Sequence, residues 1–249
     1  MMRHTMLFLG HELRATLRNP VWPLFGLMQP VLYLLLFAPL VANTTAGGTT
    51  AGTLRMFTPG VMMMIALFGS LFVGFGMIGE IRNGYLERLA VSGVWRPAIV
   101  LGRSLRDMIV LVVQAVLVIG LATLMGMRAS LPGLALMLVL MAATGLLASG
   151  LSYGTALALR DENGMSQIMQ FFAMPLVLLT GIMLPMSLAP DWMRAVAQFN
   201  PLYHAVEAGR ALFDGDFSDG SIPLAFGLLL ALSAISLRWS VGSMKRLAG

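Results

Sequence analysis

The sequence has no cysteine and a single lysine among its 249 residues, and each shortage excludes a kind of chemistry. Without cysteine, the chain can form no disulfide, thiolate metal site, iron–sulfur cluster or cysteine nucleophile. A Walker A loop ends in Gly-Lys-Ser or Gly-Lys-Thr, whereas the one lysine, Lys245, stands between Met244 and Arg246. We therefore expect no P-loop and no ATP hydrolysis by this chain alone.

Charged residues are scarce as well, and long stretches contain none. Asp, Glu, Lys and Arg make up 11% of the chain, whereas average soluble domains carry about 25%. So few charges cannot cover a globule of this size, which argues against a soluble enzyme and against a disordered chain. We predict an all-α integral membrane protein with six transmembrane helices, because six mainly apolar windows are long enough to cross a membrane. These windows cover about 21–42, 57–79, 108–127, 132–159, 167–187 and 222–237.

The basic residues lie between the apolar windows, so membrane topology explains the pI of about 10.4 better than a nucleic-acid partner does. With six spans, one side of the membrane holds Arg3, Arg14, Arg18, Arg82, Arg88, Arg96, Arg103, Arg106, Arg160, Arg238, Lys245 and Arg246. The other side holds only Arg55, Arg128, Arg194 and Arg210. Because basic residues concentrate on the cytoplasmic side, we predict a multi-pass protein of the cell (inner) membrane with both termini cytoplasmic.

Residues 1–20 have the apolar spacing of an amphipathic helix and lack the features of a cleavable signal peptide. Leu9, Leu13 and Leu17 share one helical face, and histidines and arginines share the other. A helix of this kind lies on the membrane surface, here the inner one.

Two connecting segments are unusually long. The inner one, about 80–107, carries five arginines together with helical apolar spacing. It is either a solvated connector or a coupling helix on which a cytoplasmic partner pushes, and Pro97 is expected to start the helix of the third span. The external one, about 188–221, predicts two short amphipathic helices that lie at the outer interface or dip into the membrane. We expect Asn200 to cap the second of these helices, with Pro201 at its first position.

One motif resembles an enzyme signature. The residues from Gly150 to Gly154 match the G-x-S-x-G pattern of a hydrolase nucleophile elbow, with Ser152 as nucleophile. A serine nucleophile needs a base within hydrogen-bond reach, but His204 lies in the external segment, and Ser152 falls near the cytoplasmic end of its span. The same two glycines form a Gly-xxx-Gly pair among other small residues, which favours close helix packing. An intramembrane serine hydrolase stays the enzyme alternative.

The predicted spans contain no Asp, Glu, Arg or His, the residues that ion-coupled transporters and pumps keep inside the membrane. An apolar or amphiphilic cargo suits such walls better than an ion does. A carrier or channel that works without ATP remains a second alternative. No metal site is expected, because the H-E-x-x-H pattern that begins at His11 has Ala15 in its last position.

Three groups of residues, in this order, resemble the type-2 ABC transporter permeases, close to the drug-resistance and nodulation-type export subunits. The groups are Thr58-Pro59-Gly60; residues 80–89 with Leu101-Gly102-Arg103-Ser104; and Leu184-Pro185, Trp192, Asn200-Pro201-Leu202 and residues 207–210. The resemblance extends over nearly the whole chain. It departs from the family pattern after the coupling segment, where Ser92 is followed by Gly93 and the first proline is Pro97.

The resemblance implies a single transmembrane domain over 1–249, the permease subunit of an exporter rather than an enzyme. Such a subunit pairs with a second permease protomer, identical or related, and with two copies of a separate cytoplasmic ABC ATPase. ATP and magnesium would bind to that ATPase, and this chain would bind no cofactor. The cargo would be a hydrophobic drug, a lipid or a glycan, moved outward between paired protomers.

The resemblance also implies roles for particular residues. The coupling segment is expected at 80–98, the interface helix at 1–20 and the external helices at 188–221. ATPase coupling is expected of Glu80, Arg82, Gly84, Glu87, Arg88 and Arg14. A cargo pathway between the first, second and fifth spans would be lined by Gln29, Tyr33, Met63, Phe68, Phe171 and Met174. An external gate is expected at Trp192, Asn200 and Tyr203.

Overall fold

The computed structural model describes residues 2–19, 21–42, 50–91, 96–182 and 186–245, and all regular structure in these residues is helical. The helices are α1 (Met2–Arg18), α2 (Val21–Ala42), α3 (Thr50–Leu71), α4 (Gly74–Arg82), α5 (Tyr85–Val91), α6 (Arg96–Leu124), α7 (Leu131–Leu159), α8 (Glu162–Leu178), η1 (Met186–Leu188), α9 (Asp191–Ala197), α10 (Pro201–Asp214) and α11 (Ser221–Lys245). The expectation of an all-α protein is confirmed for this part of the chain.

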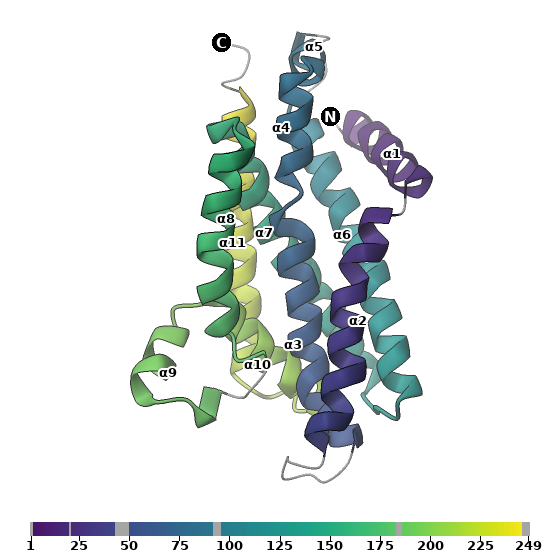
Figure 1. The fold of residues 1–249 in the computed structure, drawn as a ribbon, viewed down its shortest axis with the longest axis vertical. Coiled ribbons are helices and arrows are strands. Elements are labelled where there is room, and N and C mark those ends of the chain that lie inside the picture. Colours follow the sequence, from purple (N-terminus) through teal and green to yellow (C-terminus); the bar gives the residue numbers. More distant parts are fainter. Residues whose placement is uncertain (1, 20, 43–49, 92–95, 183–185, 246–249) are drawn as a thin grey trace.

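The long helices run side by side as a bundle, with α3 and α7 near its middle (Figure 1). Helix α7 packs against α3, α6, α10 and α11, and α3 packs against α2 and α10 as well. Helix α1 crosses the outside of the bundle at an angle and packs on α6 (Figure 1). Helices α1, α5 and the end of α11 lie at one end of the bundle, and α10 lies near the other (Figure 1).

Four helical stretches of the described chain are long and apolar enough to cross a membrane. They are Ala51–Arg82, Pro97–Leu124, Leu131–Leu159 and Ser221–Met244, and they contain or overlap four of the six predicted windows. Helix α8 has 17 residues, and the apolar stretch found in α2, Leu24–Leu36, is also shorter than a full span. The protein is therefore a multi-pass membrane protein, and the count of six spans stays a prediction.

The small residues of α7 let α11 approach closely. A Cβ added to Gly154 would collide with the indole ring of Trp239, and one added to Gly150 would collide with the Ser236 hydroxyl. Only glycine fits at either position, because any larger residue would push the two helices apart. The predicted close packing around the Gly-xxx-Gly pair is confirmed.

The second predicted span contains an interruption between α3 and α4, where the coiled ribbon gives way to a short connection (Figure 1). The hydroxyl of Ser152 donates to the carbonyl of Leu71, at 2.6 Å, and accepts the backbone N–H of Gly74, at 2.9 Å. A continuous helix would satisfy both of these backbone groups internally. Here the side chain from α7 replaces those bonds, so neither of these two backbone groups is left unsatisfied in an apolar medium.

The two long connecting segments agree with the predictions in part. The inner segment is largely helical, since α6 begins at Arg96, beside the predicted starting residue Pro97, and runs without a break through Arg103 and Asp107. In the external segment, Asn200 caps α10 and Pro201 is its first residue, as predicted. The apolar face of α10 is buried against α3, α7 and α11, so the packing partner of this helix is protein.

We expect Gly154→Ala to lower the thermal stability of the detergent-solubilised protein, because its Cβ would meet the Trp239 ring. Overpacking of this kind reduces the free energy of unfolding by about 1–3 kcal/mol. Gly120→Ala is the matched control, since Gly120 also lies in a long apolar helix and a Cβ there meets nothing within 4 Å. Equal melting temperatures for the two variants would contradict the close α7–α11 packing.

Candidate functional site

A buried arginine joins three helices near the α5 end of the bundle. Arg103, on α6, is 3% exposed and lies between two carboxylates from other helices. Its Nε is 3.2 Å from Oε1 of Glu12, on α1, and its Nη2 donates to Oε2 of Glu80, on α4. A guanidinium this deeply buried requires anionic partners, because desolvation is otherwise too unfavourable. The arginine therefore holds α1 and α4 against α6.

Neighbouring charges extend this contact to a fourth helix. Arg106 Nε lies 2.9 Å from Oδ1 of Asp107, and its Nη2 lies 3.9 Å from Oε2 of Glu12. The hydroxyl of Tyr153, on α7, donates to Oδ2 of Asp107 at 2.5 Å. We call Glu12, Glu80, Arg103, Arg106, Asp107 and Tyr153 the charge cluster. It ties α1, α4, α6 and α7 together.

The charge cluster was not predicted as a unit, although local signals for it exist. The expectation that spans lack ionisable residues fails for α6, because Arg103 and Asp107 lie inside its long apolar stretch. Their spacing with Arg106 places all three on neighbouring turns of one helix face. On α1, the face toward α6 includes Thr5, Phe8 and Glu12, so this carboxylate points inward.

A tight turn joins α4 to α5, the predicted coupling helix. Gly84 has φ +65°, a left-handed conformation that favours glycine, and its N–H donates to Ile81 O at 3.0 Å. Arg88, on α5, is exposed and donates from Nη2 to the carbonyl of Asn83 at 3.2 Å. The turn therefore presents a fixed backbone with a basic side chain at the end of the bundle.

The N-terminus of α8 is linked by ion pairs to the C-terminus of α4, next to the α4–α5 turn. Arg82 Nη1 donates to Oε1 of Glu162 at 3.0 Å, and its Nη2 lies 3.9 Å from Asp161 Oδ1. Asp161 also caps α8, since its Oδ2 accepts the N–H of Gly164 at 2.7 Å. These side chains are about half exposed, so the ion pairs position α8 but contribute little to stability.

The structure brings most of the predicted coupling residues to one end of the molecule. Glu80, Arg82, Gly84 and Arg88 belong to α4, α5 and the turn between them, and Arg14 is exposed on α1. Glu80 turns inward to Arg103, whereas Arg82 and Arg88 face solvent. The backbone of Glu87 lies within α5, and its side chain lies outside the described residues.

The predicted cargo residues have several environments. Phe171 and Met174, on α8, are 72% and 75% exposed, and Gln29, on α2, is also exposed. Tyr33 and Phe68 are half-buried, and Phe68 stacks on Phe72 with ring centroids 6.4 Å apart. Met63 is buried in the core, where its sulfur lies 3.4 Å from Oγ1 of Thr144. Their role in a cargo pathway stays a prediction.

The predicted gate residues lie near the opposite end. Trp192 is 65% exposed on α9, whereas Asn200 is buried and donates from Nδ2 to Leu176 O at 2.9 Å, which fixes the start of α10 against α8. Tyr203 packs edge-to-face on His204. Partial burial, with a further contribution from the carboxylate of Glu207, raises the pKa of Tyr203.

Arg210, on α10, makes contacts that sequence analysis did not assign. Its Nη1 donates to Glu207 Oε1 at 2.6 Å, its Nη2 to Gly181 O at 2.6 Å and its Nε to Met56 O at 3.3 Å. The side chain thus satisfies carbonyls from two other segments and holds α10 against α3. The sequence did contain one indication that Arg210 matters, because residues 207–210 belong to the segment that resembles the type-2 ABC transporter permeases.

Comparison with known proteins gives consistent matches. The family model described as "ABC-2 type transporter" matches residues 3–213. The daunorubicin resistance ABC transporter permease protein DrrB1 of Streptomyces coeruleorubidus is 26% identical over 233 residues, which cover 92% of this chain and 80% of the relative. The putative transport permease ycf38 is 22% identical over 229 residues in Porphyra purpurea, with 88% and 78% coverage. Its Cyanophora paradoxa counterpart is 25% identical over 218 residues, with 84% and 74% coverage.

Removing the central arginine should destabilise the fold. Arg103→Leu leaves the carboxylates of Glu12 and Glu80 without their shared partner, and loss of one partner from a buried ion pair reduces stability by about 3–5 kcal/mol. Arg82→Leu is the control, because its ion pairs are half exposed and contribute about 1 kcal/mol or less. Thermal unfolding in detergent measures both, and equal losses would contradict the structural role of the charge cluster.

Removing the hydroxyl at the α3–α4 break should also lower stability. Ser152→Ala leaves Leu71 O and Gly74 N–H without a partner, and a buried unsatisfied group reduces stability by about 1–3 kcal/mol. Ser149→Ala is the matched control, since Ser149 donates to Leu146 O within its own helix. If both variants unfold at the same temperature as the parent protein, the Ser152 bridge does not stabilise the break.

Proposed function

Because the chain belongs to the ABC-2 type transporter family, whose members are membrane permeases, we propose that it is the membrane-spanning subunit of an ATP-driven exporter. A separate cytoplasmic ABC ATPase, present in two copies, supplies the energy, with ATP and magnesium bound to that ATPase. A second permease protomer, identical or related, completes the transmembrane unit. All 249 residues form one transmembrane domain with six spans, and both termini are cytoplasmic in the inner membrane.

The observation that carries this proposal is the charge cluster beside the α4–α5 turn. A permease needs a rigid element at its ATPase end, so that movement of the ATPase is transmitted to the spans. Glu80 lies one turn of helix before this connection and is held by Arg103, which also holds Glu12. A displacement of α4 and α5 is thereby shared with α1, α6 and α7.

The ATPase contacts the α4–α5 turn in this proposal. Arg82 and Arg88 are exposed there, and Gly84 fixes the turn. Arg14, exposed on α1, adds a basic side chain from a second element. Such exposed arginines can form ion pairs with acidic residues of a partner, which fix the position of the partner more than they raise affinity.

Cargo moves between paired protomers along α2, α3 and α8. The exposed aromatic and methionine side chains of α8, among them Phe171 and Met174, support a hydrophobic surface there. Methionine is flexible and polarizable, so such a surface can adapt to different apolar molecules. We propose a hydrophobic drug, lipid or glycan as cargo, moved outward past Trp192, Asn200 and Tyr203.

The intramembrane hydrolase alternative has less support. The hydroxyl of Ser152 donates to Leu71 O and accepts from Gly74 N–H, so its proton is directed at a carbonyl and not at a base. His204 lies on α10, where its Nε2 is 2.8 Å from Gln198 O. The G-x-S-x-G residues therefore have a structural explanation at the helix break.

Charge reversal at the α4–α5 turn tests the function. Tagged chain purified from its native membranes should retain an ATPase with Walker motifs, and the double variant Glu87→Lys, Arg88→Glu should lose it together with ATP-dependent efflux. Arg194→Glu is the control, because Arg194 is exposed in an ion pair on α9, away from the α5 end. Efflux that persists without ATP, or ATPase binding that survives the double reversal, would overturn the assignment.

A further inference from the structure

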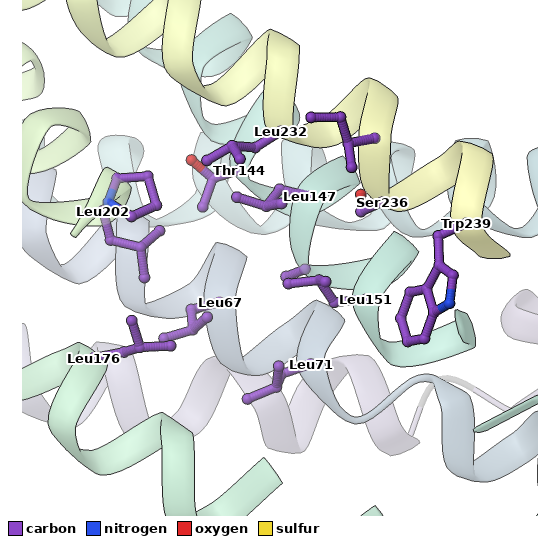
Figure 2. A pocket seen from close by; sticks show the side chains of 13 residues that line it. Leu67, Leu71, Thr144, Leu147, Leu151, Leu176, Leu202, Leu232, Ser236 and Trp239 are labelled. Carbon is purple, nitrogen blue, oxygen red and sulfur yellow. The ribbon is translucent and has the colours of Figure 1, made fainter. Parts of the chain in front are cut away.

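An apolar cavity of about 320 Å³ lies between α3, α7, α8, α10 and α11 (Figure 2). Leu67 and Leu176 line one side, and Leu147 and Leu232 line another (Figure 2). None of the predicted cargo residues is among its lining residues, although α3 and α8 contribute both to the cavity and to the proposed cargo pathway. Its volume lies in the range of small-molecule sites.

The two hydroxyls in the cavity wall already have partners. Thr144 Oγ1 donates to Leu140 O at 3.0 Å, and Ser236 Oγ donates to Ser233 O at 3.0 Å, each within its own helix. The other lining residues, Trp239 apart, are aliphatic or proline. A water molecule or a polar ligand needs several polar partners, which the described residues of this wall do not provide. The occupant must therefore be hydrocarbon.

The rim of the cavity is exposed on the outside of the bundle. Ile235 is 64% exposed, and Leu151 and Trp239 are 41% and 40% exposed. All three line the cavity and belong to helices long and apolar enough to cross a membrane. In a bilayer this rim faces lipid chains, which gives hydrocarbon from the membrane lateral access to the cavity.

We propose that the cavity binds one acyl chain of a membrane phospholipid. An empty apolar cavity of this size forfeits the dispersion contacts of its walls, and an acyl chain restores them. At the rim, Trp239 is a residue type enriched at membrane interfaces, and exposed Arg238 precedes it. A cation there attracts an anionic headgroup while the chain occupies the cavity, so the lipid is an anionic phospholipid.

Retained lipid measures this binding directly. The full-length chain is purified in mild detergent from membranes that contain phosphatidylglycerol, and native mass spectrometry reports the lipid bound per protomer. We expect one retained phospholipid, and a roughly ten-fold lower occupancy in Ala148→Phe, whose ring fills the cavity. Ala135→Phe is the matched control, because Ala135 is exposed on the same helix and does not line the cavity.

A rim variant and an optical measurement keep the test valid if Ala148→Phe misfolds. Ile235→Phe narrows the entrance at an exposed position, so folding should be preserved while retention falls. With Trp22, Trp95 and Trp192 changed to Phe, the remaining fluorescence comes from Trp239. After unbound lipid is removed, phosphatidylglycerol with brominated chains should quench the Trp239 fluorescence in the parent protein and in Ala135→Phe. It should leave this fluorescence unchanged in Ala148→Phe and Ile235→Phe.

Four outcomes would overturn the proposal. They are the absence of retained lipid, equal retention in all variants, retention of free fatty acid in place of phospholipid, and occupation of the cavity by a second copy of the chain. Neither measurement requires the ATPase or transport, so this inference can fail while the exporter assignment stands, and the reverse is also true.

Discussion

A guanidinium buried between two carboxylates sets the arrangement of one end of this protein. Arg103 is almost fully removed from solvent, and its charge is compatible with that position only while Glu12 and Glu80 are beside it. The two acids come from α1 and α4, so this contact holds both helices against α6. Tyr153 and Asp107 extend the same constraint to α7.

Hydropathy predicted the long helices because an apolar run is a property of one continuous segment of the sequence. The window at 132–159 corresponds closely to α7, where no charge interrupts the apolar pattern, whereas the window at 222–237 stops before Arg238 and α11 continues to Lys245. The window at 108–127 missed the first turns of α6, because Arg103 and Asp107 were assigned to a loop. Their partners lie on helices distant in the sequence, and a single sequence does not show that pairing.

The same distinction separates the site residues that could be predicted from those that could not. The cap at Asn200 is local, since its side chain accepts the N–H of Leu202 two residues later, and the sequence was sufficient to find it. Its second bond, to Leu176 O, depends on how α8 and α10 meet. The environment of Met63 is likewise set by tertiary packing, because this side chain is buried in the core beside Thr144 of α7, which its own sequence neighbours do not show.

The interruption between α3 and α4 has a mechanical consequence. A continuous helix transmits rotation about its axis because every turn is bonded to the next. At Leu71 and Gly74, those bonds run sideways to Ser152, so torque applied to α4 is divided between α7, through Ser152, and α3, through the backbone of residues 72–73. One membrane crossing is thus divided into two mechanical segments, and the side chain of a neighbouring helix is the joint between them.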